Sequence, residues 1–243
     1  MKNMTRFLIG TLAMVAPPAA AQDVVMALDP TLMTGWSGVA GAGEYAKRDF
    51  GTRLHRPSAR GSALAATPQR VTASLTFRPD PAVRNQVYNR AVAEWSKRDR
   101  AEGAKLRQLL QSGKVMRDMN GYMAGYGLNP NNVGDTTAMY LALAWNVVHG
   151  SSDDPGRAQV QGLRRQTAAT FATLPDFMRA GPATRQELSD ANVIQSAFVA
   201  NIANAMAKDG SLAGRARNSV AQGVKSIYGL DLRTVKLTSA GFQ

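Results

Sequence analysis

Apolar residues recur at helical spacing through most of residues 80–228, and helix-start signals precede the apolar stripes. Asp80 followed by Pro81 is typical of a helix N-terminus, because aspartate caps free backbone N–H groups and proline fits the first turn. The apolar residues behind this signal share one face: Val83, Val87, Ala91 and Trp95. Amphipathic segments joined by short polar turns bury their apolar faces against one another. The sequence therefore predicts an all-α fold, a single bundle of about six to seven helices.

The other expected helices carry comparable signals. We expect them to begin at Asp99, at Lys114, at Val133, after the acidic run 151–155, at the capping box 184–187 and near Ser211. Residues 133–149 are apolar almost all round, which is typical of a helix in the centre of a bundle. The acidic run is interpreted as a set of helix caps rather than as a catalytic or calcium-binding pair, because the helix dipole favours negative charge there.

A short pattern occurs twice, around Gly127 and around Gly229. In both copies the glycine follows a tyrosine and precedes a leucine, within a longer match at a constant offset. Glycine adopts the left-handed conformation that ends many helices, and the next leucine can fold back onto the last turn. Both copies therefore predict helix termination by a Schellman motif. A duplicated helical hairpin would leave the same pattern.

The first residues have the layout of a secretory signal peptide. Lys2 and Arg6 supply positive charge, residues 7–16 are apolar, and the alanines at 19–21 form a small-residue cleavage site. We expect cleavage after Ala21 and an exported chain, periplasmic or secreted, with no transmembrane helix in its mature form. A short membrane anchor is the alternative, but about ten apolar residues are fewer than the ~20 that span a bilayer.

Residues 22–70 are rich in glycine, alanine, serine and arginine and show no lasting apolar period. Such a segment cannot bury enough apolar surface to offset the entropy lost on ordering, so we expect a flexible basic arm, largely disordered. Aromatic residues of the arm, such as Phe50, could stack on an anionic partner or simply contact the folded domain. Apolar and polar residues alternate over 71–77, which indicates a short extended segment that leads into a helical domain at 71–243.

The residue inventory argues against several kinds of site. The chain has no cysteine and two histidines, which disfavours disulfides, cysteine-ligated zinc, iron–sulfur clusters, thiol catalysis and His-rich metal sites. No phosphate-binding glycine loop is recognisable, because Gly38, Gly41 and Gly43 do not lie between a strand and a helix. We therefore expect neither a cofactor nor a metal.

Carboxylates are the remaining route to catalysis. Glycoside cleavage needs two of them around one bond, one kept protonated by an apolar pocket. Glu94 beside Trp95 is the best single candidate, with Asp135 and Glu187 as candidate partners. Glu94 lies among surface-type positions and Glu187 already has the capping role, so catalysis is the alternative hypothesis.

Two further candidates have simpler interpretations. His149 is the one base for nucleophilic chemistry inside the expected domain, but it lies at a helix end, where a cation complements the dipole. The asparagine-rich loop 129–132 followed by Asp135 resembles a calcium loop, yet it offers one carboxylate where such loops use several. Turn formation is the favoured interpretation of this loop.

Positive charge is the remaining feature with functional content. The chain carries 29 Lys and Arg against 17 Asp and Glu, a net charge of +12, and loss of residues 1–21 leaves +10. Short basic clusters fall on expected helix faces and are candidate contacts to an anionic partner: Lys97, Arg98, Arg100, Arg164, Arg165, Arg215 and Arg217. Solvated faces that serve only solubility give the same clusters. Anionic glycans, lipid headgroups or acidic proteins are expected partners rather than nucleic acid, because no recognition module is present.

Several segments carry a family resemblance. They are LTFRPDPAVRNQV at 75–87, GYGLNPNNVGD running into ALAWNVVHG within 125–150, DDPGRAQ at 153–159, RQELSD at 185–190 and YGLDLRTVKLTSAGF at 228–242. Together with the signal peptide and the basic arm, they resemble a family of secreted proteobacterial proteins classed as a domain of unknown function. The resemblance covers about residues 71–243 and implies an exported helical domain. Because the family has no assigned activity, the resemblance implies no catalytic or binding residues.

On these grounds we expect an exported, non-catalytic helical protein of the cell envelope that binds an anionic envelope component or another protein. The alternative is a carboxylate-dependent envelope hydrolase of the glycoside-cleaving type. In the first case the surplus positive charge recognises the partner. In the second, Glu94 acts on the substrate.

Overall fold

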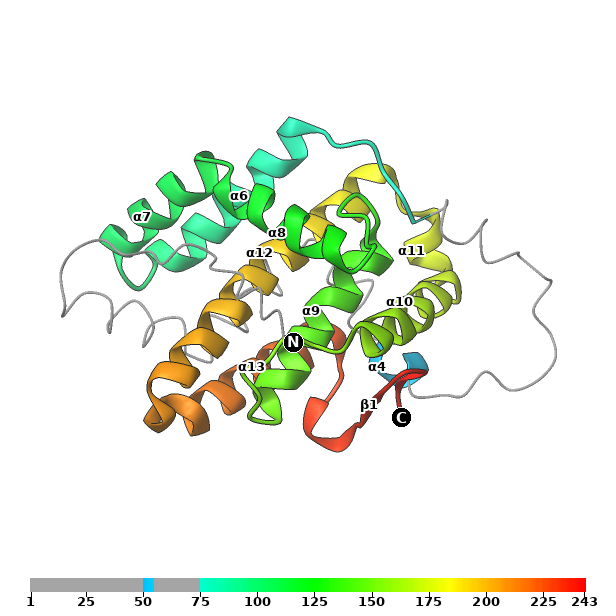
Figure 1. The fold of residues 1–243 in the computed structure, drawn as a ribbon. Coiled ribbons are helices and arrows are strands. Elements are labelled where there is room, and N and C mark those ends of the chain that lie inside the picture. The colour runs from blue at the N-terminus through cyan, green and yellow to red at the C-terminus, as the bar shows by residue number, and fades with distance from the viewer. Residues whose placement is uncertain (1–49, 55–74) are drawn as a thin grey trace.

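The computed structural model describes residues 50–54 and 75–243 of the chain. Regular structure within these ranges is almost entirely helical, so the predicted all-α class is confirmed (Figure 1). The predicted signal peptide at 1–21 lies outside the described residues, as does the predicted arm except for 50–54. Among the described residues, no helix is both long and apolar enough to cross a membrane.

The helices follow one another along the chain with short connections. They are α4 (Phe50–Leu54), α6 (Pro81–Ser96), α7 (Arg100–Gln111), α8 (Lys114–Gly125), α9 (Val133–Val148), α10 (Arg157–Ala172), α11 (Pro175–Arg179), α12 (Pro182–Lys208) and α13 (Ala213–Tyr228). Two 3₁₀ turns, η1 (Gly210–Leu212) and η2 (Leu232–Thr234), flank α13. Strands β1 (Leu237–Thr238) and β2 (Gly241–Phe242) form an antiparallel pair at the C-terminus. In Figure 1, α6 and α7 lie at one end of the molecule, and α10, α4 and the strands lie at the other.

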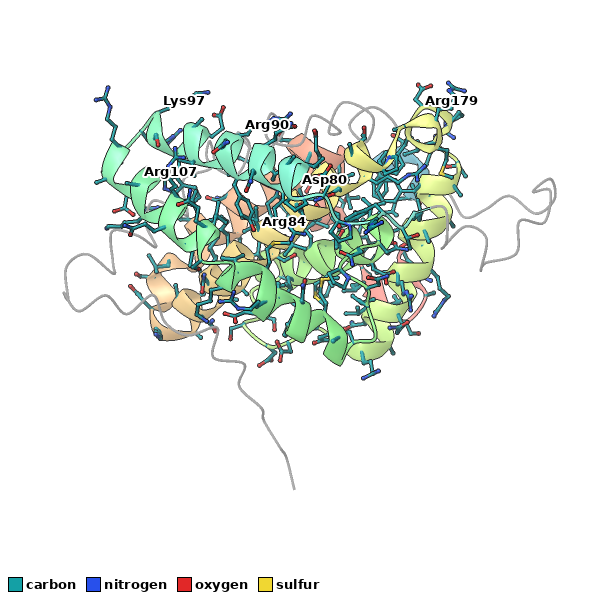
Figure 2. All side chains as sticks on the ribbon, turned by 90° about the horizontal axis from the view of Figure 1, so that it is seen from above. Asp80, Arg84, Arg90, Lys97, Arg107 and Arg179 are labelled. Carbon is teal, nitrogen blue, oxygen red and sulfur yellow. The ribbon has the colours of Figure 1, made fainter. Side chains whose placement is uncertain are left out.

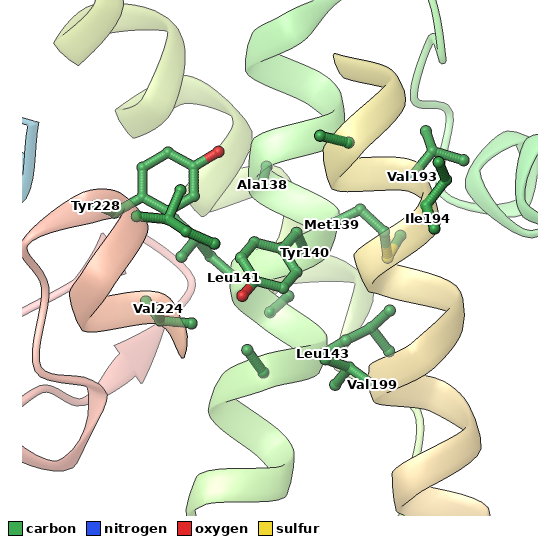
Figure 3. Close-up of a cluster of buried hydrophobic side chains, with 14 of the residues drawn as sticks. Ala138, Met139, Tyr140, Leu141, Leu143, Val193, Ile194, Val199, Val224 and Tyr228 are labelled. Carbon is green, nitrogen blue, oxygen red and sulfur yellow. The ribbon is translucent and has the colours of Figure 1, made fainter. Parts of the chain in front are cut away.

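Helix α9 occupies the centre of the bundle, as its apolar sequence predicts. Every residue of α9 is buried except Trp145, which is partly buried and donates its indole N–H to the Val235 carbonyl at 2.9 Å. α10, α12 and α13 surround α9. Figure 3 shows its side chains, among them Met139 and Leu143, packed between the apolar side chains of α12 and α13. Since the chain has no cysteine, apolar burial of this kind supplies the stability that a disulfide would add elsewhere.

A buried polar cluster joins the three central helices. The Tyr228 hydroxyl of α13 donates to Asn192 Oδ1 of α12 at 2.7 Å. The Asn192 amide in turn donates to Thr137 Oγ1 of α9 at 2.9 Å. Burial raises the pKa of the Tyr228 hydroxyl, so it stays protonated as the donor. A fully satisfied cluster of this kind fixes the relative register of the helices.

Helix boundaries that depend on local sequence are where they were predicted. Asp80 and Asp99 each accept backbone N–H groups of the first turn behind them, at 2.7–3.1 Å. Gly113 separates α7 from α8 with a φ of +68°, a conformation that glycine adopts without strain. The expected helix at Lys114–Gly125 is confirmed residue for residue.

The expected helix after the acidic run 151–155 is present, but the predicted role of the acidic residues as its caps is wrong. α10 begins at Arg157, and Gly156 takes the N-cap position. Asp154 accepts a hydrogen bond from the Tyr122 hydroxyl of α8 at 2.7 Å. The carboxylate therefore ties the loop before α10 to α8 instead of capping a helix.

The predicted capping box at 184–187 is also wrong. α12 begins at Pro182, two residues before Thr184, because proline fits the first turn of a helix. Glu187 lies inside the helix and forms an ion pair with Arg90 of α6, with 3.0 Å between Nη1 and Oε2. This pair joins α12 to α6.

Both predicted helix-ending glycines adopt the left-handed conformation, with φ of +71° at Gly127 and +65° at Gly229. After α8, the Leu128 N–H donates to the Met123 carbonyl at 3.1 Å, which confirms the Schellman motif. After α13, the Gly229 N–H donates to the Lys225 carbonyl at 3.0 Å, which is the simpler left-handed cap. The two copies thus end their helices by related but different hydrogen bonds.

Helix α4 is the one part of the predicted arm that the structure describes, and it packs against α10. Phe50 is fully buried, and its ring centroid lies 4.8 Å from that of Phe171 and 5.0 Å from that of Tyr228. Leu54 is also buried, and its carbonyl accepts a hydrogen bond from the Gln166 amide at 2.8 Å. Phe50 and Leu54 belong to the core, so the folded unit includes residues upstream of residue 71.

The expected extended segment is seen from residue 75 onward, since 71–74 lie outside the described residues. The Val133 N–H donates to the Leu75 carbonyl at 3.2 Å, and the Phe77 N–H donates to the Asn131 carbonyl at 3.0 Å. The segment therefore pairs with the loop before α9, a partner that the sequence did not reveal.

The C-terminal hairpin was not predicted from the sequence. β1 and β2 are two residues each, with Leu237 opposite Phe242, and they pack on α10. Gln166 of α10 accepts the Phe242 N–H at 2.7 Å and donates to the Phe242 carbonyl at 3.0 Å. A side-chain amide thus replaces a third strand at this edge.

Candidate binding surface

A groove of about 230 Å³ opens between α6 and α7, which pack side by side after the short turn 97–99. α6 contributes Asn85, Tyr88, Asn89 and Val92, and α7 contributes Arg107, Leu110 and Gln111. Within each helix these residues are three or four positions apart, so they share one face. The hairpin of two helices therefore presents a continuous polar and apolar surface between them.

The groove has an apolar floor and a polar rim. Val92 and Leu110 are buried at the floor, and Tyr88 is 8% exposed. The exposed side chains of the rim are those of Asn85, Asn89, Arg107 and Gln111. None of these four side chains forms a hydrogen bond or ion pair with the described part of the chain. Their donors and acceptors face solvent and are available to a ligand.

Helix α6 is held firmly against α12 on its other side. Arg84 makes two hydrogen bonds to the Asp190 carboxylate, at 3.1 and 3.2 Å, and Asp190 is buried. Farther along, the rings of Trp95 and Phe198 lie 4.8 Å apart. With the Arg90–Glu187 pair, these contacts fix the α6 wall of the groove. Figure 2 shows Arg84 and Arg90 along α6 and Arg107 on the neighbouring α7.

The start of α7 sets the position of the other wall. Replacing Asp99 by alanine removes the cap on the N–H groups of Ala101 and Glu102, so the free energy of unfolding is expected to fall by about 1 kcal/mol. Asp99→Asn, which keeps the accepting oxygen, is the control and should lose a few tenths of a kcal/mol at most. Urea unfolding followed by circular dichroism measures both. Equal losses in the two variants would contradict the capping role.

Basic residues predicted at the α6–α7 turn have different surroundings. Lys97 pairs with Glu94 one turn before it, with 2.6 Å between Nζ and Oε1. Arg98 also interacts with another group of the protein. Arg100 is exposed and has no hydrogen bond or ion pair among the described residues. Of this predicted cluster, Arg100 is therefore the residue available to a partner.

The predicted pair on α10 contributes to the fold. Arg164 donates through Nε to the buried Asp135 carboxylate at 2.9 Å. Arg165 donates to the Ser239 carbonyl at 3.0 Å, which holds the turn of the C-terminal hairpin. In contrast to the expectation of a solvated cluster, both guanidinium groups bind elements of the same chain.

The predicted pair on α13 remains at the surface. Arg215 and Arg217 are exposed, and neither has a hydrogen bond or ion pair in the described ranges. The Arg217 guanidinium lies over Gly150, where an added Cβ would meet Nη2 at 2.2 Å. These two cations are therefore open to an external anion.

The described surface has an excess of unpaired positive charge. Exposed cations without a hydrogen bond or ion pair in residues 50–54 and 75–243 are Arg78, Arg100, Arg107, Lys208, Arg215, Arg217 and Lys236. Every carboxylate in the same ranges except that of Asp153 accepts a hydrogen bond or an ion pair. In the described ranges, nearly every carboxylate thus has a partner within the chain, whereas these seven cations have none.

The three carboxylates of the hydrolase hypothesis lie on three helices, α6, α9 and α12. Each pairs with a different cation: Glu94 with Lys97, Asp135 with Arg164, and Glu187 with Arg90. A general acid needs an apolar environment without a neighbouring cation, because a cation favours the ionised form. The observed pairing is therefore unlike that of a glycosidase acid.

His149 and the asparagine loop have structural surroundings. His149 ends α9, stacks on Trp145 with ring centroids 4.2 Å apart, and places Nε2 3.1 Å from the Leu232 carbonyl. In the loop, Asn132 Oδ1 caps α9, which agrees with turn formation. The described residues contain no group of three or more His, Cys, Asp or Glu side chains that could hold a metal ion.

The comparisons with known proteins give a family but no activity. The profile of a family of unknown function, DUF6683, matches residues 7–243. The chain belongs to the DUF6683 family. No curated protein and no solved structure gives a significant match. Both α4 and the groove lie within the matched residues.

Proposed function

We propose that this DUF6683 protein is an exported, non-catalytic binding protein that recognises an acidic glycan of the cell envelope. The observation that carries the proposal is the imbalance of the surface charge. Every carboxylate in the described ranges except that of Asp153 has a hydrogen-bond or ion-pair partner there, whereas seven exposed cations have none. Export is inferred from the layout of residues 1–21, and the mature chain keeps a net charge of +10.

Unpaired surface cations act on a partner in two ways. They raise the local concentration of a polyanion and accelerate its encounter with the protein. They also exchange small counterions for charged groups of the partner, so that the affinity falls as salt is added. An extended acidic polymer can contact cations on different helices at once, such as Arg107 on α7 and Arg215 on α13. A small anion cannot.

The test uses the mature chain, residues 22–243, and polygalacturonate as the anionic polymer, with dextran as the neutral one. Binding to polygalacturonate is expected at low salt and should weaken by at least tenfold between 20 and 200 mM NaCl, as read by isothermal titration calorimetry. Replacing Arg215 and Arg217 together by glutamine should also weaken binding to polygalacturonate at low salt. The matched lysine variant keeps the charge and should retain most of the affinity.

The outcomes separate this proposal from its rivals. Equal binding to both polymers, or no binding to polygalacturonate, would contradict it. Preferential binding to vesicles of anionic lipid would point to a membrane partner instead. Cleavage of an envelope polymer that is lost in Glu94→Gln would overturn the non-catalytic assignment, whereas the proposal expects Glu94→Gln to leave binding unchanged.

A further inference from the structure

We infer that the α6–α7 groove is a recognition site for a single carboxylated sugar unit, with the sugar carboxylate on Arg107 and the hydroxyls on the amides of the rim. The inference rests on the proposed function, because it names the part of an acidic glycan that the chain recognises. Exposed charge alone does not distinguish a sugar from other anions. The groove would supply that specificity.

The charge of the groove suits a monoanion. Arg107 is the one charged residue among those that line it, and its guanidinium has no partner in the described chain. A guanidinium matches a carboxylate through two parallel N–H···O bonds. Phosphate carries more charge and is commonly bound by several cations or by backbone N–H groups as well. One free guanidinium therefore favours a carboxylate.

The amides of the rim suit hydroxyl groups. Asn85, Asn89 and Gln111 each present an N–H donor and a carbonyl acceptor. A sugar hydroxyl also donates and accepts, so neighbouring hydroxyls can make paired hydrogen bonds with such amides. These side chains have no partner in the described residues, so no hydrogen bond within those residues has to break on binding.

The size and the floor of the groove suit one ring. Sites for drug-sized ligands enclose about 300–1,000 Å³, and the groove, at about 230 Å³, falls below that range. A single monosaccharide unit is of the appropriate size, and the opening to solvent leaves room for the adjoining units of a polymer. Val92 and Leu110 at the floor provide apolar surface for the C–H groups of the ring.

The walls of the groove are formed before a ligand arrives. Arg84 and Arg90 fasten α6 to α12 through buried or partly buried carboxylates, and Asp99 caps α7. A site on fixed helices loses less entropy when it binds its ligand than a site on loops does. The arrangement therefore fits selective binding of a small, rigid ring.

The decisive experiment compares two variants of the mature chain that each remove one positive charge from α7, Arg107→Gln in the groove and Arg100→Gln outside it. Both residues are exposed and have no partner in the described ranges, so neither variant should change the thermal melting curve. Both lose one charge and the same long-range attraction. Arg107→Gln is expected to weaken binding of trigalacturonate by about tenfold, and Arg100→Gln by less than threefold.

A second pair of variants tests the amides. Gln111→Ala is expected to weaken trigalacturonate binding several-fold, because it removes a hydroxyl contact. Gln108→Ala, three residues earlier on the exposed surface of α7 and not part of the groove lining, should have no effect. The uncharged trisaccharide maltotriose should bind much more weakly than trigalacturonate, since it lacks the carboxylate that pairs with Arg107.

Failure of this inference is distinguishable from failure of the proposed function. Equal effects of Arg107→Gln and Arg100→Gln, with binding of polygalacturonate preserved, would overturn the groove as the sugar site and leave the proposed function standing. Inorganic phosphate that competes better than galacturonate would overturn the ligand class. If neither polygalacturonate nor trigalacturonate binds at low salt, both proposals fail.

Discussion

Replacing Phe50 by alanine is expected to lower the free energy of unfolding by about 3–5 kcal/mol, because a fully buried phenylalanine loses both its apolar burial and its packing contacts. Its ring lies against Phe171 of α10 and Tyr228 of α13, so the substitution opens a cavity between two helices. Urea unfolding of the mature chain, followed by circular dichroism, measures the loss. A reduced urea midpoint with an unchanged slope is the expected pattern.

Two controls show whether the loss comes from docking of α4. Thr52 lies on the exposed side of the same helix, and Thr52→Ala should change the stability by less than about 0.5 kcal/mol. Phe50→Leu keeps an apolar side chain of similar length and should lose less than the alanine variant. A loss below about 1 kcal/mol for Phe50→Ala would mean that α4 is not a fixed part of the core.

Replacing Arg164 by alanine is expected to lower the free energy of unfolding at pH 7 by about 2–3 kcal/mol, since it leaves the buried Asp135 carboxylate without its cation. The side chain of Asp135 is 3% exposed and that of Arg164 is 32% exposed. The loss is therefore smaller than for a pair that is buried on both sides. The Asn129 N–H still donates to Asp135 Oδ2 at 2.8 Å and retains part of the stabilisation.

The pH dependence of this variant gives a specific readout. Burial raises the pKa of Asp135 above its ordinary value, while the Asn129 N–H and Arg164 oppose that rise. A carboxyl whose folded pKa is raised destabilises the protein when ionised, and this cost disappears as the pH falls towards the unfolded pKa of about 3.9. The deficit of Arg164→Ala relative to the natural chain should therefore shrink between pH 7 and pH 4.5.

A double variant completes the test. Arg164→Ala combined with Asp135→Asn removes the buried charge together with its partner, and an amide oxygen can still accept the Asn129 N–H. The double variant should regain more than half of the stability lost by Arg164→Ala, and its stability should lack the pH dependence that Asp135 gives to the single variant. A deficit that is the same at pH 7 and pH 4.5 in the single variant would contradict the ion-pair explanation.

Local signals predicted much of the fold. The caps at Asp80 and Asp99 act within one turn, so their effect can be read from neighbouring residues alone. The apolar stretch at 133–149 also identified α9 as the central helix, because this signal lies within one segment of the sequence. The two caps that were predicted wrongly have distant partners instead: Asp154 accepts a hydrogen bond from Tyr122, and Glu187 pairs with Arg90 from inside α12.

The candidate site was predictable only in part. Composition revealed the surplus of positive charge, and Arg100, predicted as a partner contact, lies unpaired at the surface. The groove could not be predicted, because it exists only where α6 and α7 pack together. Asn85 and Asn89 gave a weak local signal, since they flank the apolar stripe of α6 at helical spacing. Arg164 was assigned to the surface because nothing local indicates its pairing with Asp135.

Because α4 packs on the helical domain, we expect the smallest independently folding fragment of this protein to include α4. A recombinant fragment that starts at residue 71 lacks Phe50 and Leu54, and it would expose the aromatic surface that these side chains cover on α10 and α13. Such bare apolar surface promotes self-association. Expression and crystallisation trials should therefore use fragments whose N-terminus precedes Phe50.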